Sequence, residues 1–339
     1  MNISELARHL GVSVSTVSRV LSGNAEKYRI SDKTVRRIQK AAEENHVSPD
    51  PLGAGLRRGR LAMVGLLVPD ITNSFFAQLA RAIESEFRPH GIAVQLCDSA
   101  EDSKTELELL GKLLSRRLDG LILAPVGKSS PKLSRTIAGS RMPIILIDRL
   151  LPGVDAVAVS LDNEHAGHLA ATRLLESGHQ RIGCLRGDPE SPTDEARFMG
   201  VRKALLEAGF AEDRLLSAGR GYSHAESLVG AEELLLHETK LTALITLSGQ
   251  GALAALEVAR RLSIRVPEDL SLVAFDEQPW SNLMQPPITT VAQPVDAMAR
   301  RAVELLENSR ESEKEGKNKT EPQLFAASVM DRESVSELS

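Results

Sequence analysis

The chain has 339 residues, of which 42% are hydrophobic, 26% charged and 3% aromatic, which fits a globular protein large enough for two or three domains. No apolar run is long enough to cross a bilayer, and residues 1–12 lack the basic and apolar blocks of a secretory signal. We therefore expect a cytoplasmic protein rather than a membrane or secreted one, in which Cys97 and Cys184 are reduced, buried thiols.

The net charge of −5 hides an asymmetry along the chain. Residues 1–60 contain 11 Lys and Arg against 6 Asp and Glu, a net charge of +5, whereas the remainder contains 30 against 40, a net charge of −10. A small basic head on a larger acidic body predicts that only the head binds a polyanion.

Three short helical patterns make up residues 1–48. The first begins at Ile3, is capped by Asn2 and ends at Gly11, and the third begins at Ser31 and runs through Lys33–Glu44. Their inward residues are Leu6, Leu10, Val35, Ile38 and Ala42. Three short helices that share a small core form a helix-turn-helix module.

Between them, Val12–Gly23 reads VSVSTVSRVLSG, and its alternation of apolar and hydroxyl residues also fits an edge strand. No partner strand is near it in the sequence, and Ser13 is a good helix N-cap. If the segment is a helix, three apolar residues at spacings of three and four face the core: Val17, Val20 and Leu21. We therefore predict a second helix here.

The outer face of this second helix carries Val14, Ser15, Ser18 and Arg19. A recognition helix presents such a set to the major groove, because arginine can make a bidentate contact to guanine, hydroxyls reach bases or phosphates, and a valine methyl can touch thymine. The alternative is an ordinary solvated helix, but the basic head and the arginine-rich segment that follows favour DNA binding.

Residues 49–60 (PDPLGAGLRRGR) are rich in Pro, Gly and Arg and predict a linker. From Leu61 onward, short apolar runs alternate with amphipathic stretches. The candidate strands are Met63–Val68, Ile92–Leu96, Gly120–Ala124, Ile144–Ile147, Ile182–Leu185, Ala243–Leu247 and Leu270–Phe275. This pattern indicates parallel sheets covered by helices on both faces. About a dozen such units are too many for one open sheet, so we expect two lobes with a small-ligand crevice at the strand ends.

The segments GVSVSTVSRVLSG and ISDKTVRRIQKAAEENHVSPD resemble the headpiece of the LacI family of bacterial transcription repressors. Further segments are similar to that family's core, among them VGLLVPDITNSFFAQLARAIE, LDNEHAGHLAATRLLESGHQRIG and VPEDLSLVAFDE, and the resemblance spans nearly the whole chain. It implies an all-α helix-turn-helix headpiece (1–48), a hinge (49–60) and an α/β core (61–339) that resembles two-lobed periplasmic sugar-binding proteins. One lobe is expected to combine 61–160 with 292–322, and the other 161–291 with 323–339.

The resemblance also implies the DNA-binding residues. They are Ser13, Val14, Ser15, Thr16, Ser18 and Arg19, with Ser31 and Thr34 on phosphates, and Leu56 and Arg57 in the hinge. Leu56 matches a leucine that the family inserts into the minor groove. Gly53 and Gly55 each cost a helix about 1 kcal/mol relative to Ala, so we expect the hinge helix to order only on DNA; a flexible tether is the alternative. Lys27, Tyr28 and Arg29 lie in a turn longer than in many relatives and either contact phosphates or are solvated.

By the same resemblance, an effector pocket lies in the core. Its expected residues are Phe75, Phe76, Asp148, Arg149, Ser191, Thr193, Arg197, Tyr222, Ser248, Asp276 and Gln293. Carboxylates and guanidinium groups suit vicinal hydroxyls, and an aromatic ring covers an apolar sugar face. The structural alternatives are a salt bridge for Arg197 and Asp276 and core packing for Tyr222 and Phe75. Relatives often have Asn-Asp where Ser248 and Gly249 stand, so a carboxylate or amide is missing from that wall.

We therefore expect a repressor that binds a near-palindromic operator in double-stranded DNA as a homodimer and is released by a sugar, a sugar derivative or a similar small molecule. The alternative is a repressor activated by a purine- or nucleoside-type corepressor. A soluble sugar-binding protein and a Rossmann-like enzyme are the other classes considered. The sequence lacks a GxGxxG turn after a strand, a Walker loop and metal-ligand spacing, so we expect no catalytic residue, cofactor or metal.

Overall fold

The computed structural model describes residues 1–21, 23, 25–45, 47, 62–127, 130–151, 153–154, 156–211, 215–311 and 321–338. The chain divides into two compact units, Met1–Ala62 and Met63–Ser339. The predicted hinge, with Leu56 and Arg57, lies outside the described residues. No helix within the described ranges is both long enough and apolar enough to span a bilayer.

The N-terminal unit contains α1 (Ile3–Leu10), α2 (Val14–Leu21) and α3 (Asp32–Glu44). Asn2 caps α1 in a capping box with Glu5, and Gly11 ends that helix with a φ of 64°. The Ser13 hydroxyl accepts a hydrogen bond from the Thr16 amide at 3.0 Å at the start of α2. The segment that alternates apolar and hydroxyl residues is therefore a helix, and the edge-strand alternative is excluded.

All three helices contribute to one small core. Leu6, Val17 and Ile38 are fully buried in it, together with Val20 and Ala42. The spacing of Val17 and Val20 turns the opposite face of α2 outward, as the sequence predicts. The Arg37 guanidinium also donates to the Leu10 carbonyl at 3.1 Å, which ties α3 to α1.

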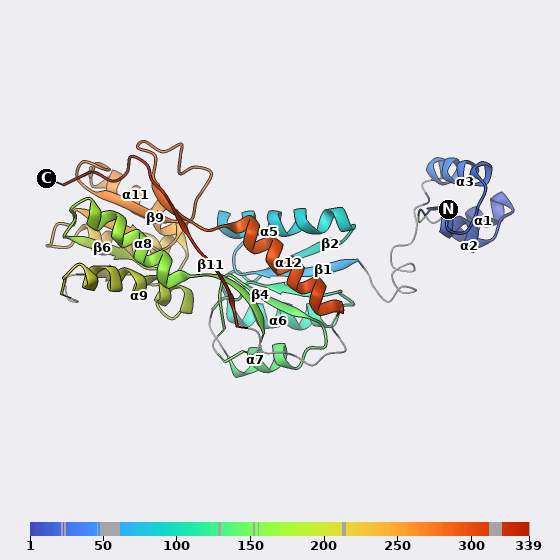
Figure 1. Cartoon of the computed structure of the whole chain (residues 1–339), viewed down its shortest axis with the longest axis horizontal. Helices are drawn as coiled ribbons and strands as arrows, with labels where there is room; N and C mark the ends of the chain where they lie inside the picture. The colour runs from blue at the N-terminus through green and yellow to red at the C-terminus, as the bar shows by residue number, and fades with distance from the viewer. Residues whose placement is uncertain are drawn as a thin grey trace. The chain divides into compact units, whose positions relative to one another are not determined.

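The first lobe of the C-terminal unit is built on a parallel sheet with the strand order β11-β5-β4-β3-β1-β2. Its strands are β1 (Met63–Val68), β2 (Ala93–Asp98), β3 (Leu121–Leu123), β4 (Ile144–Ile147), β5 (Val157–Leu161) and β11 (Gln323–Phe325). Its helices are α5 (Ser74–Phe87), the 3-10 helix η1 (Arg88–His90), α6 (Ser103–Leu114), α7 (Pro131–Ala138) and α12 (Val295–Glu311). Helices α5 and α12 cover one face of the sheet, and α6 and α7 cover the other (Figure 1).

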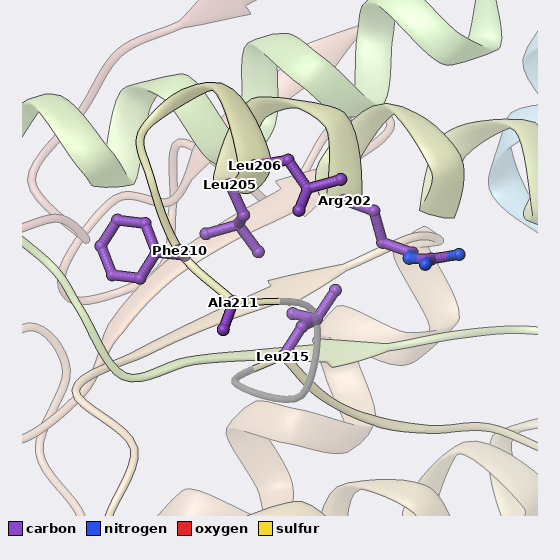
Figure 2. A pocket seen from close by; sticks show the side chains of 6 residues that line it. All are labelled: Arg202, Leu205, Leu206, Phe210, Ala211 and Leu215. Atoms are coloured by element: carbon purple, nitrogen blue, oxygen red, sulfur yellow. The ribbon is translucent and has the colours of Figure 1, made fainter.

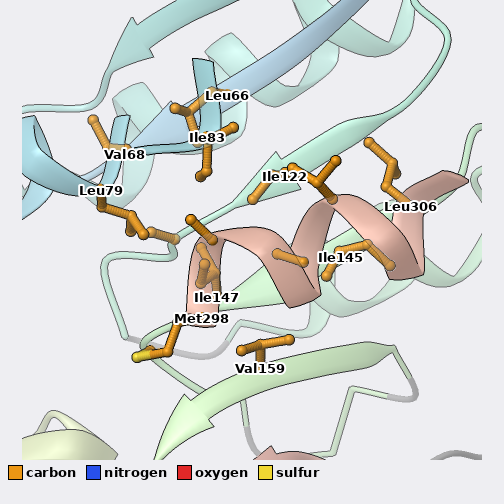
Figure 3. Packing of buried hydrophobic residues seen from close by; sticks show 14 of the residues in the cluster. Leu66, Val68, Leu79, Ile83, Ile122, Ile145, Ile147, Val159, Met298 and Leu306 are labelled. Carbon is orange, nitrogen blue, oxygen red and sulfur yellow. The ribbon is translucent and has the colours of Figure 1, made fainter. Parts of the chain in front are cut away.

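Figure 3 shows how the first of these faces is filled. Leu66 of β1, Ile83 of α5 and Met298 of α12 point into one hydrophobic cluster and are fully buried. Strands β3, β4 and β5 add Ile122, Ile145 and Val159. Because α12 follows the second lobe in the chain and still packs here, the two lobes are joined by several crossings of the chain.

The second lobe has the strand order β12-β10-β9-β8-β6-β7, parallel except for β12 against β10. Its strands are β6 (Ile182–Leu185), β7 (Leu216–Ala218), β8 (Ala243–Thr246), β9 (Ser271–Phe275), β10 (Thr289–Ala292) and β12 (Ser328–Met330). Its helices are α8 (Asn163–Glu176) and α9 (Pro192–Glu207) on one face, and α10 (His224–Leu235) and α11 (Gly249–Arg261) on the other. The predicted two-lobed α/β core is confirmed.

Two details differ from the sequence prediction. Strands β5, β7, β10, β11 and β12 were not predicted, and β2 lies at Ala93–Asp98 rather than Ile92–Leu96. The last crossing between lobes was expected after residue 322, but β11 still pairs with β5 of the first lobe, so the chain crosses between Phe325 and Ser328. Backbone pairing places β11 there, and a three-residue strand has no periodicity to reveal it.

Helices α8 and α9 approach each other closely at two glycines. A Cβ atom on Gly167 would lie 1.9 Å from the Arg197 carbonyl oxygen, and one on Gly200 would lie 1.9 Å from the Glu164 carbonyl oxygen. These obstacles are backbone atoms, so neither can rotate away. The two glycines therefore set the distance between the helix that carries Arg197 and its neighbour.

We expect Gly200→Ala to destabilise the core by about 1–3 kcal/mol, because the helices must separate to admit the methyl group. Urea unfolding followed by circular dichroism measures the change. Gly111→Ala in α6 is the matched control, because nothing lies within 4 Å of the position that its added methyl group would take. Equal stabilities for the two variants would contradict this account of the helix pair.

Candidate functional site

The predicted effector residues gather where the strands of both lobes end. Asp148 and Arg149 directly follow β4, Asp276 follows β9, and Gln293 follows β10. Asp148 and Asp276 both adopt left-handed backbone conformations, with φ values of 66° and 70°, which Asp tolerates better than most residues. Each lobe thus has a buried carboxylate directly after the third strand of its sheet order.

Arg149 is the most heavily engaged of these side chains. Its two terminal nitrogens donate to both carboxylate oxygens of Glu101 at 2.8 and 2.7 Å, and one also donates to the Val126 carbonyl at 2.9 Å. Its guanidinium carbon lies 4.5 Å from the ring centroid of Tyr222 and 5.4 Å from that of Phe76. Since Tyr222 belongs to the second lobe, this stacking joins the two lobes.

Asp148 is buried beside these groups. Burial raises the pKa of its carboxyl to about 6, although the nearby Arg197 and Arg149 oppose the rise. Its Oδ1 atom has no hydrogen-bond partner in the part of the chain that the structure describes. A buried carboxylate oxygen without a partner is costly unless a ligand donates to it.

Asp276 is held from two sides within the second lobe. The Gln293 amide donates to its Oδ1 at 2.7 Å, and the Gly249 backbone N–H donates to its Oδ2 at 3.4 Å. Gly249 opens α11, so the carboxylate faces a helix N-terminus that favours negative charge. Ser248 caps that helix by accepting from the Gly251 amide at 3.1 Å, which occupies its hydroxyl locally.

Arg197 projects from α9 and is fixed by protein partners. It donates to the Asn163 side chain and to the Leu247 carbonyl, both at 2.8 Å, and lies 4.5 Å from the ring centroid of Phe275. Thr193 stands in the first turn of the same helix and is buried. Phe75 and Phe76 are buried in the core of the first lobe, with their rings 5.1 Å apart.

Two further contacts between the lobes were not predicted. The Ser74 hydroxyl at the start of α5 donates to the side-chain oxygen of Gln278, which follows β9. A Cβ on Gly127 would lie 3.3 Å from the Ser191 hydroxyl, so these segments approach closely. Gln278 and Glu101 both lie within a few residues of a strand's carboxyl end, so that rule, applied to every strand, would have found them.

Glu106 in α6 hydrogen-bonds the backbone that Arg149 also contacts. Its Oε1 accepts from the Val126 amide at 2.7 Å, while the Val126 carbonyl accepts from Arg149. The side chain is 1% exposed. Burial raises the pKa of this carboxyl from 4.5 to about 7, against the opposing effects of the Val126 N–H and Arg149.

Because the pKa of Glu106 is higher in the folded chain than the 4.5 of an exposed glutamate, folding is favoured by protonation. Stability should therefore fall as pH rises from about 4.5 to about 7. Glu106→Gln keeps an acceptor for Val126 and should stabilise the protein by about 2–3 kcal/mol at pH 8 and by under about 1 kcal/mol at pH 5. Urea unfolding at both pH values tests this, with the exposed Glu108→Gln as control; an equal gain at both would contradict it.

In the headpiece, the predicted DNA-binding residues include two clusters of hydroxyl side chains, together with Val14 and one arginine. The Ser13 hydroxyl lies 2.8 Å from that of Ser15 and 2.7 Å from that of Thr16. Ser31 and Thr34 form a similar pair at 2.9 Å at the start of α3. Val14 is 48% exposed, Arg19 is exposed, and Ser18 is half-buried.

Two hollows in the second lobe contain none of these residues. The first, between α9 and the segment after it, is lined by Arg202, Leu205, Leu206, Phe210, Ala211 and Leu215 (Figure 2). The second, of about 240 Å³, lies beside β7 and includes Arg186 and Arg220. Both arginines are paired with acidic residues, Arg186 with Asp194 and Arg220 with Glu233. Neither hollow therefore coincides with the residues predicted to bind a ligand.

Comparison with known proteins finds a matching family for each of the two units. The model of bacterial regulatory proteins of the lacI family matches residues 2–50, and that of the periplasmic binding protein-like domain matches residues 171–335. The HTH-type transcriptional regulator DegA of Bacillus subtilis (strain 168) is 35% identical over 300 residues, 87% of each chain. This chain belongs to the LacI family.

Other members agree with this assignment. The HTH-type transcriptional repressor CytR of Escherichia coli (strain K12) is 32% identical over 306 residues, 90% of this chain and 88% of that one. A LacI family transcriptional regulator from Enterococcus faecium with bound ribose has a TM-score of 0.73 and 27% identity over 82% of this chain and all of that one. The resemblance seen in the sequence is confirmed: this LacI family protein is a DNA-binding transcriptional regulator and not an enzyme.

Proposed function

We propose that this LacI family regulator is a repressor that binds a near-palindromic operator as a homodimer in the bacterial cytoplasm, and that a small, uncharged, sugar-like effector releases it. The relative from Enterococcus faecium with bound ribose supports a sugar as the effector. The residues that the sequence assigns to the pocket are the residues we propose as effector ligands: Phe75, Phe76, Asp148, Arg149, Ser191, Thr193, Arg197, Tyr222, Ser248, Asp276 and Gln293.

The observation that carries this proposal is a set of buried polar atoms at the lobe boundary. Asp148 Oδ1, Gln293 Oε1 and Gln278 Nε2 are buried without a partner among the described residues. Two are acceptors and one is a donor. A hydroxylated ligand satisfies both kinds, because each hydroxyl donates and accepts.

The charges at the boundary favour an uncharged ligand. Arg149 is already bound by Glu101 and Val126, and Arg197 by Asn163 and Leu247. The atoms without partners include a carboxylate oxygen of Asp148, which repels a phosphate and attracts a hydroxyl. A sugar phosphate should therefore bind more weakly than the corresponding sugar.

For the DNA half, we propose that α2 lies in the major groove and reads bases through Val14, Ser15, Ser18 and Arg19. Ser13 and Thr16, at its first turn, and Ser31 and Thr34, at the first turn of α3, would contact phosphates, since helix N-termini attract anions. Leu56 and Arg57 of the hinge would contact the minor groove. A dimer would place two such helices at a spacing that fits two half-sites.

The effector would act by changing the arrangement of the lobes. The contacts of Arg149 with Tyr222 and of Ser74 with Gln278 join them, and Arg149 and Tyr222 are themselves proposed ligands. A sugar that binds there would replace or rearrange these contacts. By linkage, the factor by which effector weakens DNA binding equals the factor by which DNA weakens effector binding.

A thermal-shift screen of the full chain against pentoses, hexoses, disaccharides, their phosphates, nucleosides and purines tests this proposal. Saturating binding stabilises the folded state by about 2.7 kcal/mol at a hundredfold excess over Kd. We expect an uncharged sugar to give the largest shift and to weaken binding to an operator selected from random duplexes. A shift from purines or nucleosides alone, with tighter DNA binding, would instead establish a corepressor, and a response to sugar phosphates alone would contradict the proposal.

A further inference from the structure

The turn between α2 and α3 is anchored at both ends. The Ile30 amide donates to the Ala25 carbonyl at 3.0 Å, and the Arg29 amide donates to the Glu26 carbonyl at 2.9 Å. Ala25 and Ile30 pack against the core of the headpiece. Arg29 adopts a φ of 52°. These constraints fix the backbone that carries the residue between them, Tyr28.

Tyr28 lies against the one arginine of the predicted recognition face. The Arg19 guanidinium carbon is 3.9 Å from the centroid of the Tyr28 ring, well within the range of a cation–π contact. Tyr28 is 47% exposed and outside the core cluster of the headpiece. The ring is thus not part of the headpiece core, and it contacts the side chain of Arg19 on α2.

The form of the contact leaves Arg19 able to bind a base. A guanidinium stacks through its flat face, whereas its N–H donors point outward in its plane. Stacking on Tyr28 thus orients this plane without using the donors that a bidentate contact to guanine needs. It also restricts the rotamers of a long, exposed side chain before DNA binds, which lowers the entropy lost on binding.

We propose that Tyr28 is a positioning residue for base recognition, which holds the Arg19 guanidinium in the plane that reads the operator. This proposal rests on the proposed role of Arg19 in base recognition. It assigns Tyr28 a function different from the phosphate contact that its place in a basic turn suggests. Its aromatic ring is the essential part, and its hydroxyl is not.

The test compares Tyr28→Phe and Tyr28→Leu in the full chain, each with Arg19 present and with Arg19→Ala. Affinity is measured by fluorescence anisotropy for an operator duplex selected by the wild type and for a scrambled duplex of equal length. Tyr28→Leu should weaken operator binding about two- to fivefold per headpiece and leave scrambled binding unchanged. Tyr28→Phe should match the wild type, and Tyr28→Leu should have no effect when Arg19 is already Ala.

Three results would overturn the proposal. Equal losses for Tyr28→Phe and Tyr28→Leu would show that the hydroxyl contacts DNA. A Tyr28→Leu loss that persists with Arg19→Ala would show that the ring acts independently of Arg19. An unchanged Tyr28→Leu would show that Arg19 needs no positioning. If Arg19 itself has no role in base recognition, Arg19→Ala alone would retain the preference for the operator, so that failure is distinguished from failure of the Tyr28 proposal.

Discussion

Replacing Arg19 with alanine is expected to remove most of the preference of the protein for its operator over scrambled DNA. The side chain is exposed on α2 and is the only basic group on the predicted recognition face. A bidentate contact between arginine and guanine contributes about 1–3 kcal/mol of discrimination. A dimer uses it twice, so the specificity ratio should fall by a factor of roughly 30 to 10⁴.

The measurement is the ratio of the two dissociation constants at one fixed salt concentration, because non-specific affinity changes steeply with salt. Arg36→Ala is the matched control: it removes an equal charge from an exposed position on α3 and should weaken both duplexes alike. The thermal stability and effector response of the Arg19 variant should equal those of the wild type. A specificity ratio that matches that of Arg36→Ala would remove Arg19 from the recognition surface.

The headpiece could be predicted closely because local signals agree there. Asn2, Gly11 and Ser13 mark helix ends by their own hydrogen bonds and backbone angles, and only a helical spacing buries both Val17 and Val20. The contact between Arg19 and Tyr28 could not be predicted in the same way. It depends on the path of the turn from Ala25 to Ile30, which the structure fixes through backbone hydrogen bonds.

In the core, the strands that were predicted are mostly apolar runs, and several short strands that pair with them were missed. The sequence of β5, VAVSL, contains a polar residue, and β7, β11 and β12 have three residues each. Such segments become strands because a neighbouring strand offers hydrogen-bond partners, as β5 does for β11. The hydrophobic periodicity of a single sequence indicates which side chains are buried, but it does not indicate which strands pair.

The candidate site divides along the same line. Asp148 and Asp276 were predicted from the family resemblance, and both directly follow predicted strands, where the strand-end rule also expects ligand-binding groups. The contacts that join the lobes link residues far apart in the chain: Ser74 and Gln278 are separated by 204 positions. Glu101 and Glu106 gain their significance only because Arg149 and Val126 pack against them. For Glu101 and Gln278 a place near a strand end is a signal in their own segments, but the partners that they contact follow from tertiary packing.

The second large effect is expected at Asp276. Its carboxylate accepts from Gln293 and from the Gly249 amide, which orients it at the lobe boundary. Asp276→Asn keeps a side chain of the same shape, and Asn tolerates the left-handed φ of 70°. The substitution removes the negative charge. It also replaces one acceptor oxygen by an NH₂ donor, which would face the N–H donor of Gln293 or of Gly249. Sugar hydroxyls then lose a charge-assisted acceptor worth about 1.5–3 kcal/mol, or about 10- to 150-fold in affinity.

Isothermal titration of the variant with the sugar that gives the largest thermal shift measures this loss, and anisotropy measures whether operator affinity is retained. Asp269→Asn is the matched control, because that aspartate forms its ion pair with Arg265 on the surface and should leave both affinities unchanged. If Asp276→Asn weakened sugar and operator equally, the residue would support the fold rather than the ligand. A selective loss of sugar affinity, with operator binding intact but no longer released by the sugar, is the result that a ligand-binding carboxylate requires.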